Sequence, residues 1–362
     1  MMNIRKDFST WSILSYNTML TIPMPLRFNG QTQRARAIPE AIYRYHLQNP
    51  IDVLVLSELI APADSKYVLG RLADLGWRYQ SAPLPSSILH GQFLSGGVYV
   101  VSRHRILSQA THAFTHCGGV DCFISKGIVH CKLQKDGQII HIFGTHLQAW
   151  NNKIGRVVRT EQVEEVRDFI QRLTGSSPHP VLLCGDLNID RYSRGAELRA
   201  ALHRLDMHFG TDSIVGHPYT IDPQRNSLVG NDDPSMYSTP RHPRGCYAEY
   251  MNSMYCECCP QEWLDYIVYS KDHPQPLTTV LTPILLKTEP YLMRFSATIA
   301  RTHSDLSDHF PLLGVFTFPL TSPGDTPVRR HLPPPIQSAP HTTSRRLIVL
   351  SLLLGVIVYA FP

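Results

Sequence analysis

The sequence predicts an α+β fold, a four-layer α/β/β/α sandwich in which two mostly antiparallel sheets are flanked by helices. Two observations lead to this prediction. Apolar runs of strand length recur with stretches of helical period between them, and Lys135-Asp136-Gly137 joins two such runs as a tight hairpin turn would. Intervening helices favour helical outer layers, whereas a hairpin favours antiparallel pairing over a doubly wound parallel sheet.

The individual elements follow from local patterns. Helices are expected at Asp64–Leu75 and Thr160–Leu173, because each stretch places its apolar residues on one face, and Thr160 is positioned as the N-cap of the second. Residues 231–260 show no period and are rich in Pro, Asp, Tyr and Cys, which predicts a surface insertion. The expected strands are Ser12–Tyr16, Val53–Leu56, Gly97–Val101, Ile128–Leu133, Ile139–Gly144, Val181–Cys184, Ile267–Tyr269 and Leu312–Phe318.

Composition divides the chain of 362 residues into three regions. Residues 1–320 show no linker-like gap, so we expect one large domain. Residues 321–346 contain six prolines and predict a disordered tether. Residues 347–362 are hydrophobic and predict a C-terminal membrane segment, although the uncharged part, Leu347–Phe361, would extend only ~22 Å as a helix against a bilayer core of ~30 Å. A hydrophobic end that packs on the domain is the alternative.

The flanking residues and the cysteines bear on localisation. Arg345-Arg346 precedes the hydrophobic segment and favours a cytosolic position for the preceding chain. Met1–Asp7 contains no apolar stretch of signal-peptide type, and eight cysteines in so long a chain do not make a disulfide framework. We therefore expect a membrane-associated protein whose main domain lies in the reducing cytosol with free thiols. The C-x-C-C spacing at 256–259 does not match a zinc site, and free thiols are expected there too.

The charge balance argues against a nucleic-acid partner. Of the formal net charge of +5, residues 1–320 carry only +2, because Arg329, Arg330, Arg345, Arg346 and Asp325 supply the remaining +3. So small an excess does not predict a broad basic face.

Short polar clusters stand at the ends of the apolar runs. Gly185-Asp186-Leu187-Asn188 follows one run, and Ser307-Asp308-His309-Phe310 precedes another. Strands deliver such side chains to one edge of a sheet, where acids, amides and imidazoles can hold a divalent cation, bind phosphate and activate water. Each cluster alone is more often a cap, a turn or a core histidine, but six of them predict metal-assisted phosphodiester hydrolysis. The other four clusters contain Asn17, Glu58, His146 and Asp265.

These motifs resemble the sphingomyelinase C-type neutral sphingomyelinases of the endonuclease/exonuclease/phosphatase superfamily. The resemblance covers roughly residues 12–318 and implies a DNase-like form of the sandwich. Ser125-Lys126-Gly127 looks like the phosphate-loop segment of these enzymes. The motifs that carry the resemblance are Gly144-Thr145-His146-Leu147-Gln148-Ala149, Gly185-Asp186-Leu187-Asn188, Leu264-Asp265-Tyr266-Ile267 with Ser270-Lys271-Asp272-His273, and Ser307-Asp308-His309.

The resemblance implies a Mg²⁺ cofactor, for which Mn²⁺ could substitute. Glu58 would be the main protein ligand, since a strongly hydrated cation uses few carboxylates, and Asn17 would orient the water shell or a phosphate oxygen. Asp186 and Asn188 would position the attacking water and bind a phosphoryl oxygen. Bacterial relatives carry acidic and amide residues for a second metal site where this chain has Leu59–Pro62 and Phe93–Ser95, so we expect that site to be absent.

The resemblance also implies roles for the remaining residues. His309 would be the general base, held by a carboxylate for which Asp265 and Asp308 are both candidates. His146 would donate to the phosphate as charge builds, and Lys126 would add positive potential there. Cys117 matches a disulfide-forming position of secreted relatives, but the matching partner region, 151–160, contains no cysteine, in agreement with a reducing compartment.

The implied reaction is hydrolysis of membrane sphingomyelin, or a related choline phospholipid, to ceramide and phosphocholine by in-line attack of water. Three alternatives remain: a nuclease or an inositol-phosphate phosphatase of the same fold, and an inert membrane-tethered binding protein. Residues 285–295 occupy the place of an aromatic membrane-docking hairpin in the relatives, and they could equally form a core strand pair.

Overall fold

The structure is a computed structural model, and it describes residues 8–21, 30–86, 94–175, 177–229, 261–294 and 300–320. Three predicted regions lie outside these residues: the insertion at 231–260, the tether at 321–346 and the hydrophobic segment at 347–362. The predicted division of the chain at residue 320 therefore stays a prediction.

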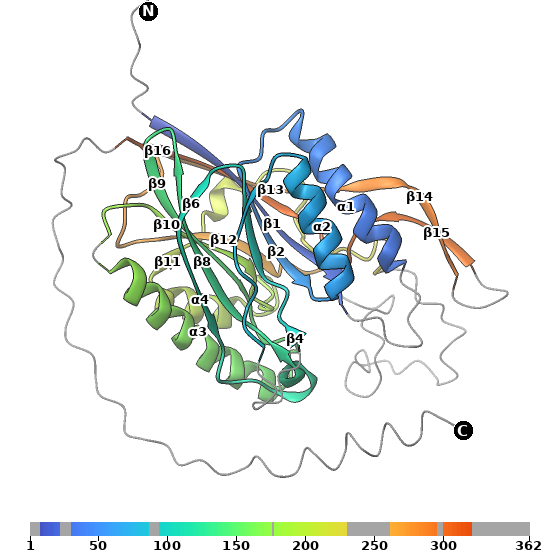
Figure 1. Ribbon diagram of the computed structural model, residues 1–362. Coiled ribbons are helices and arrows are strands. Elements are labelled where there is room, and N and C mark those ends of the chain that lie inside the picture. Colours follow the sequence, from blue (N-terminus) through green and yellow to red (C-terminus); the bar gives the residue numbers. More distant parts are fainter. Residues whose placement is uncertain are drawn as a thin grey trace, which may run out of the picture. The chain divides into compact units, whose positions relative to one another are not determined.

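Two six-stranded sheets form the centre of the fold (Figure 1). In spatial order the first contains β13 (Thr278–Pro283), β16 (Leu312–Pro319), β1 (Phe8–Leu20), β2 (Val53–Leu59), β5 (Tyr99–Ser102) and β3 (Tyr79–Gln80). The second contains β11 (Met207–His208), β12 (Asp265–Ser270), β10 (Val181–Asp186), β9 (Gln138–His146), β8 (Gly127–Lys135) and β6 (Arg105–Ala113).

Within the two large sheets, the described strands pair antiparallel except for β1 with β2 and β9 with β10. The predicted hairpin is present, since Lys135 pairs with Gln138 across the β8–β9 turn. Asp136 and Gly137 both have positive φ there, as a tight primed turn requires. The predicted sandwich of two mostly antiparallel sheets is confirmed.

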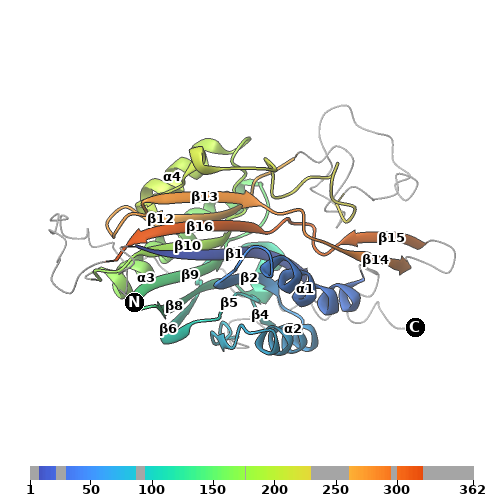
Figure 2. The same cartoon turned by 90° about the horizontal axis from the view of Figure 1, so that it is seen from above.

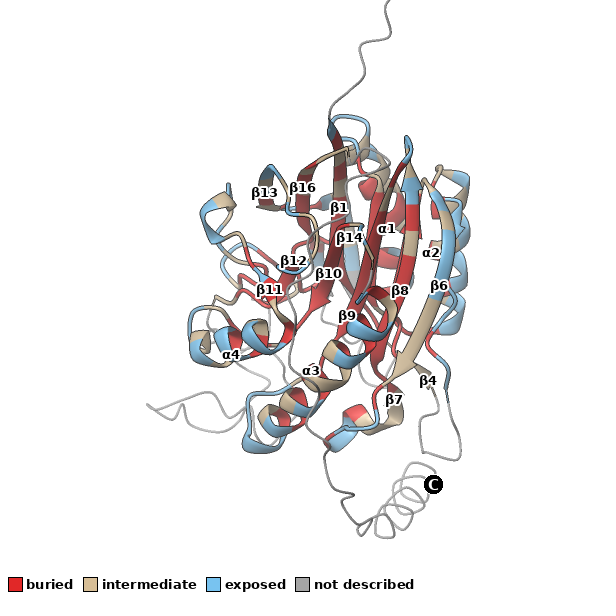
Figure 3. Ribbon diagram, turned by 90° about the vertical axis from the view of Figure 1, so that its left-hand side faces the viewer, coloured by how far each residue is buried: buried red, intermediate tan, exposed pale blue. Residues whose placement is uncertain are grey.

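Helices cover the outer faces of the sheets. Helices α1 (Gln31–His46) and α2 (Pro62–Asp74) pack against the first sheet, and α3 (Lys153–Thr174) and α4 (Gly195–Leu205) against the second (Figure 1). Successive side chains of β1 point to opposite faces of the sheet, so the strand contacts two layers. Ile13 belongs to the core between the sheets, whereas Leu14 packs with α1 and α2. Figure 3 shows the buried strands between half-exposed helices. Short 3₁₀ helices occupy Gly119–Phe123 and Thr211–Ser213.

Two small strand pairs lie outside the main sheets. Strand β4 (Leu94–Ser95) pairs with β7 (Ile124–Ser125), and β14 (Lys287–Arg294) pairs with β15 (Ala300–Asp305). The β14–β15 pair extends away from the sandwich beside α1 (Figure 2). The described part of the segment at 285–295 thus contributes to a projecting strand pair rather than to either main sheet.

The predicted N-cap of the third helix is wrong. Helix α3 begins at Lys153, where the Asn152 side chain accepts a hydrogen bond from the Gly155 amide. Thr160 lies inside the helix, and its hydroxyl donates to the Arg156 carbonyl one turn earlier. The apolar stripe marked the middle of the helix but not its start, where the apolar Ile154 is exposed rather than buried.

The prediction that all thiols are free is also wrong. Cys117 and Cys122 form a disulfide, whereas Cys131 and Cys184 are free and buried. The Cys117 partner lies five residues along the chain, not in the 151–160 region that the resemblance implied. The segment that contains the short 3₁₀ helix brings the two cysteines together, and sequence spacing alone did not reveal this turn.

Candidate active site

Strand register gathers the polar strand ends at one edge of the sandwich. At the end of β10, Asp186 pairs with His146 of the parallel strand β9 and with Asp265 of the antiparallel strand β12. Three residues far apart in the sequence therefore lie side by side. From the first sheet, β1 carries Asn17 and β2 carries Glu58 to the same place, because Asn17 pairs with Ser57 in the parallel register.

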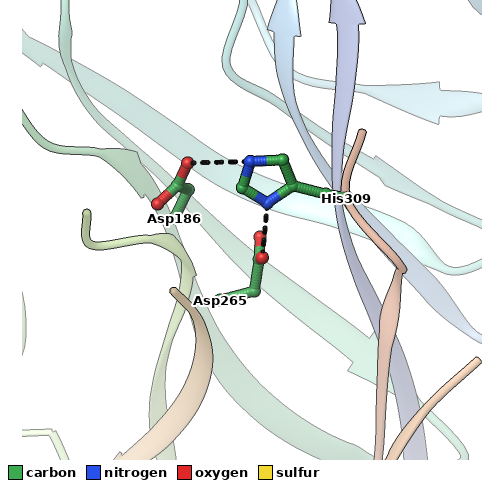
Figure 4. Close-up of side chains that lie close together, drawn as sticks. All are labelled: Asp186, Asp265 and His309. Carbon is green, nitrogen blue, oxygen red and sulfur yellow. Dashed lines mark hydrogen bonds and ion pairs between the residues drawn. The ribbon is translucent and has the colours of Figure 1, made fainter. Parts of the chain in front are cut away.

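His309 is the centre of the first group of contacts. Its Nδ1 lies 2.7 Å from Asp265 Oδ2, and its Nε2 lies 3.8 Å from Asp186 Oδ2 (Figure 4). Burial alone would lower the pKa of His309, but the carboxylates of Asp265 and Asp308 raise it well above its usual value. The ring therefore has a high affinity for a proton, and the Asp265 contact orients it.

Glu58, Asn17 and Asp186 form the second group. The Asn17 Nδ2 donates to Glu58 Oε1 and to Asp186 Oδ2, both at 3.1 Å. Burial, with the nearby charge of Asp308, raises the pKa of Glu58 to about 7, and burial raises that of Asp186 to about 6. Two carboxylates thus converge on one amide group in a place that is short of positive charge.

His146 and Lys126 form the third group. His146 Nε2 lies 3.8 Å from Glu58 Oε1, 3.7 Å from Asp186 Oδ2 and 3.2 Å from Lys126 Nζ. Burial, Lys126 and His309 lower the pKa of His146 well below its usual value, so the ring is neutral. Lys126 is buried, and its ammonium group also contacts Asp121 Oδ2 at 2.7 Å and donates to the Leu147 carbonyl.

Asn188 and Asp308 complete the predicted set. The Asn188 amide donates to Asp186 Oδ1 at 2.8 Å, and its side chain donates to the Leu147 carbonyl. Asp308 accepts a hydrogen bond from the Ser307 hydroxyl, and its charge raises the pKa of both Glu58 and His309. All nine residues predicted from the sequence therefore lie in one neighbourhood. The structure also separates two candidates that the sequence could not, since Asp265 is the carboxylate hydrogen-bonded to His309.

Three supporting residues were not assigned roles from the sequence. Arg34 is fully buried and donates to the carbonyls of Thr18, Met19 and Leu306, which ties β1 to the segment before His309. Asn226 donates to the carbonyls of Ser307 and Asp308, and Asp121 pairs with Lys126. No local pattern in the sequence distinguishes Arg34 or Asp121 from surface charges.

The donor set fits a hard divalent cation. Among the described residues, no Lys or Arg forms an ion pair with Glu58 or Asp186, although both carboxylates point toward the same amide. The carboxyl and imidazole donor atoms of Asp186, Asp265 and His309 also lie within 4.8 Å of one another. Carboxylate and amide oxygens are the ligands that Mg²⁺ prefers. Because Asp265 and His309 bind each other, the Glu58–Asp186 side of the group is the better place for an ion.

Comparison with known proteins agrees with this geometry. A family model described as the Endonuclease/Exonuclease/phosphatase family matches residues 9–309. Phospholipase C of Staphylococcus aureus is 27% identical over 327 residues, or 85% of this chain and 88% of that protein. Sphingomyelinase C of Bacillus cereus is 29% identical over 300 residues, which cover 78% of this chain and 81% of that protein. A beta toxin variant of Staphylococcus aureus with bound magnesium ions superposes with a TM-score of 0.67 at 26% identity, covering 85% of this chain and 99% of that chain.

The predicted localisation, a membrane-associated protein with a cytosolic catalytic domain held by a C-terminal segment, is wrong. The similar proteins include a bacterial toxin that the chain matches over nearly its whole length. The Cys117–Cys122 disulfide is of a kind that persists in oxidising rather than reducing surroundings. Among the described residues, no helix is both long and apolar enough to cross a bilayer.

Proposed function

Because this chain belongs to the endonuclease/exonuclease/phosphatase family, with sphingomyelinases C among its relatives, we propose that it hydrolyses the phosphodiester of sphingomyelin to ceramide and phosphocholine. The observation that carries the proposal is the convergence of His309, Asp265 and Asp186 beside Glu58. The relatives named phospholipase C and sphingomyelinase C support a choline phospholipid as the substrate.

His309 is the general base of the proposed reaction. Since Nδ1 lies within hydrogen-bond distance of Asp265, it carries the proton and donates to that carboxylate. The other ring nitrogen, Nε2, is 3.8 Å from Asp186 Oδ2, beyond direct hydrogen-bond range, and in the neutral ring it is available to take a proton from water. The imidazolium that forms is stabilised by Asp265 and Asp308, as the direction of the His309 pKa indicates.

Asp186 and Asn188 position the attacking water and a phosphoryl oxygen. The Asp186 carboxylate lies between the His309 and His146 rings, at 3.8 and 3.7 Å, so a water held there could reach the base. The Asn188 side chain donates to the Leu147 carbonyl with one of its two N–H bonds and retains the other for a phosphoryl oxygen.

His146 and Lys126 act on the phosphate in the proposed reaction. The neutral His146 ring faces the two carboxylates through Nε2, and Lys126 Nζ approaches the same nitrogen. Lys126 is held by Asp121 and the Leu147 carbonyl, so its first effect is to orient His146 and to supply positive potential. Donation from His146 Nε2 to a phosphate oxygen requires the tautomer protonated at Nε2, with Lys126 released from that nitrogen.

Glu58 would hold a Mg²⁺ ion, with Asn17 ordering its water shell, and Mn²⁺ could substitute. When bound, such an ion would supply Lewis-acid polarisation of a phosphoryl oxygen and stabilisation of the charge on the leaving oxygen. The Glu58 side chain suits this role because it keeps 23% exposure, whereas Asp186 is almost fully enclosed.

A mixed-micelle assay tests the proposed function. Purified protein is incubated with sphingomyelin, phosphatidylcholine, a phosphoinositide or supercoiled plasmid, each with Mg²⁺ and with chelator. We expect phosphocholine release from sphingomyelin that stops with chelator and returns when Mg²⁺ or Mn²⁺ is added. Plasmid nicking or orthophosphate release without phosphocholine would overturn the proposal in favour of a nuclease or an inositol-phosphate phosphatase. Binding to sphingomyelin without any hydrolysis would identify an inert binding protein.

A further inference from the structure

A polar pocket lies outside the active site, where the loop 223–227 meets the β14–β15 pair. Its volume is about 320 Å³, which falls at the lower end of the range for small-molecule sites, about 300–1,000 Å³. Its lining offers cationic, hydroxyl and amide groups rather than an apolar wall, so it suits a charged or strongly polar ligand. The residues that matter for the argument are Arg225, Ser227, Lys287, Thr302, Ser304 and Asp305.

The acidic residue in the pocket is already satisfied. The Asp305 side chain is 1% exposed and accepts from the Ser227 amide at 2.8 Å and the Ser227 hydroxyl at 2.7 Å. Lys287 Nζ forms an ion pair with Asp305 and donates to the Arg225 carbonyl at 2.9 Å. Because Lys287 neutralises Asp305, this pair adds no net charge, and the carboxylate has little capacity left to bind a cation.

Arg225 therefore determines the charge of the pocket. The residue is exposed, and its guanidinium forms no hydrogen bond or ion pair with any residue that the structure describes. A guanidinium presents five N–H donors in a planar fork that matches phosphate oxygens. The hydroxyls of Thr302 and Ser304 add donors from the β15 side. The balance of the pocket is one positive charge with several free donors, which favours an oxyanion.

We propose that this pocket binds a phosphate group that is separate from the phosphodiester at the active site. The ligand is either the phosphate of a membrane lipid headgroup or a free phosphate ion, which share the same chemistry. The β14–β15 pair that forms one wall projects from the sandwich, so a headgroup at a surface could reach the pocket (Figure 2). The inference does not depend on the proposed reaction, because binding is measurable without turnover.

The pocket is connected to the catalytic segment. Asn226, in the loop that lines the pocket, donates to the carbonyls of Ser307 and Asp308 at 2.8 and 3.1 Å. The other wall, β15, ends at Asp305, four residues before His309. A phosphate that bridges Arg225 and β15 would hold both walls together, and these walls support the segment that carries His309.

Arg225→Gln tests the proposal, with Arg105→Gln as a control that removes the same charge from an exposed position on β6. Binding to phosphatidylcholine vesicles with and without phosphatidylglycerol is measured by sedimentation. We expect Arg225→Gln to bind the anionic vesicles about fivefold more weakly, the usual effect of one basic residue at an anionic surface, and Arg105→Gln to bind like the wild type. Lys287 is unsuitable for this test, since its removal would leave buried Asp305 without a counter-charge.

A second arm separates the two sources of phosphate. Inorganic phosphate is titrated into the full-length wild type and into Arg225→Gln, and binding is followed by calorimetry. A saturable calorimetric binding of phosphate that the wild type shows and Arg225→Gln lacks supports a free-phosphate site. Vesicle binding that is weakened in Arg225→Gln but not in Arg105→Gln, with no saturable phosphate binding in the wild type, supports a lipid headgroup. If the two variants weaken vesicle binding equally, or if Arg225→Gln changes neither measurement, the proposal is overturned.

Discussion

Glu58 has a backbone conformation that few side chains adopt. Its φ is +53°, in the left-handed region, at the end of β2. A carboxylate residue in this region costs about 1–3 kcal/mol and persists only where the surroundings enforce it. The neighbouring Gly97 is part of the cause: its carbonyl accepts from the Leu59 amide, and a Cβ at Gly97 would lie 2.5 Å from the Leu59 nitrogen. The close approach of the two backbones thus turns Glu58 toward the active site.

Asp265 acts through His309, which leads to a prediction about the pair. We expect Asp265→Asn and His309→Ala each to lower kcat by about 10²- to 10⁴-fold, because one disturbs the orientation and tautomer of the base and the other removes it. The double variant should be no worse than the poorer single variant, since the two residues act as a unit. Steady-state kinetics on a soluble choline phosphodiester and circular dichroism provide the measurements.

The exposed His203 on α4 provides a matched control for this pair, and His203→Ala should retain wild-type kinetics. Additive losses in the double variant would show that Asp265 contributes independently of His309, contrary to the assigned roles.

At the scale of elements, strand register decides which polar residues meet. Asp186 stands opposite His146 in a parallel pair and opposite Asp265 in an antiparallel pair. A shift of one residue in either pairing would turn Asp186 to the other face of the sheet. The cores on both sides of the sheets prevent such a shift, because alternate residues of each strand are buried against different layers.

Strands β8 and β9 also bury a histidine pair that predicts acid sensitivity. His130 Nε2 lies 2.9 Å from His141 Nδ1, and the rings stack at 5.1 Å. Burial, with Lys132 close by, lowers the pKa of His130 to about 4. Burial and the charges of His130 and Lys132 lower that of His141 to about 3, and His179 and His273 act in the same direction. Because both values lie below the unfolded value of ~6.5, the unfolded state takes up protons first as pH falls.

The pair should therefore contribute its full stability above pH ~6.5 and lose it progressively toward the folded pKa values. Between about pH 7 and pH 5, we expect each histidine to lower the free energy of unfolding by about 1–2 kcal/mol. His130→Gln cannot be protonated and should show a smaller loss in urea unfolding at the two pH values. A His130→Gln variant with the same pH dependence as the wild type would contradict the assignment, and exposed His203→Gln should not alter that dependence.

The Cys117–Cys122 loop supports the active site indirectly. Asp121 lies inside this loop, where it pairs with Lys126 at 2.7 Å and accepts from the Ala149 amide at 2.9 Å. We expect replacement of both cysteines by serine to lower the free energy of unfolding by about 2 kcal/mol, the loop-closure estimate for so short a loop. Activity should also fall, because Lys126 loses part of its support. Denaturant unfolding and kinetics measure the two effects, and a reductant should reproduce them in the wild type but not in the double variant.

For the whole molecule, the two sheets together create a site that neither contains alone. Asn17 and Glu58 come from the first sheet, and Asp186 and His146 from the second. A cation bound between them would link the two halves of the sandwich. Such binding stabilises the folded state by mass action, since the unfolded chain does not hold the ligands together.

Addition of Mg²⁺ should therefore raise the Tm. With Mg²⁺ at about a hundredfold excess over its Kd, the stabilisation is ~2.7 kcal/mol, which corresponds to a shift of about 5–10 °C. Glu58→Gln should reduce the shift, while Glu161→Gln, at an exposed position of α3, should leave it unchanged. Calorimetry with Mg²⁺ and with chelator is the measurement. An undiminished shift in Glu58→Gln would assign the ion to other ligands.

Elements with a strong local pattern were predictable, and those without one were not. The apolar runs at Val181–Cys184 and Leu312–Phe318 lie within β10 and β16 because burial on both faces requires continuous apolar sequence. Helix α1 was missed, since it contains Pro39 and several polar residues and depends on packing against β1 and β2. Strand β6 was missed because it is a half-exposed edge strand with little apolar pattern.

The sequence by itself determined which polar residue types stand at the strand ends, because these residues and the apolar runs beside them are local properties of the chain. Only the tertiary structure decided which of these side chains contact one another. It paired His309 with Asp265 rather than Asp308, committed Lys126 to Asp121, and joined Cys117 to Cys122. Each of these contacts depends on strand register or on the path of a loop, and both are set by how the whole core packs rather than by any short stretch of sequence.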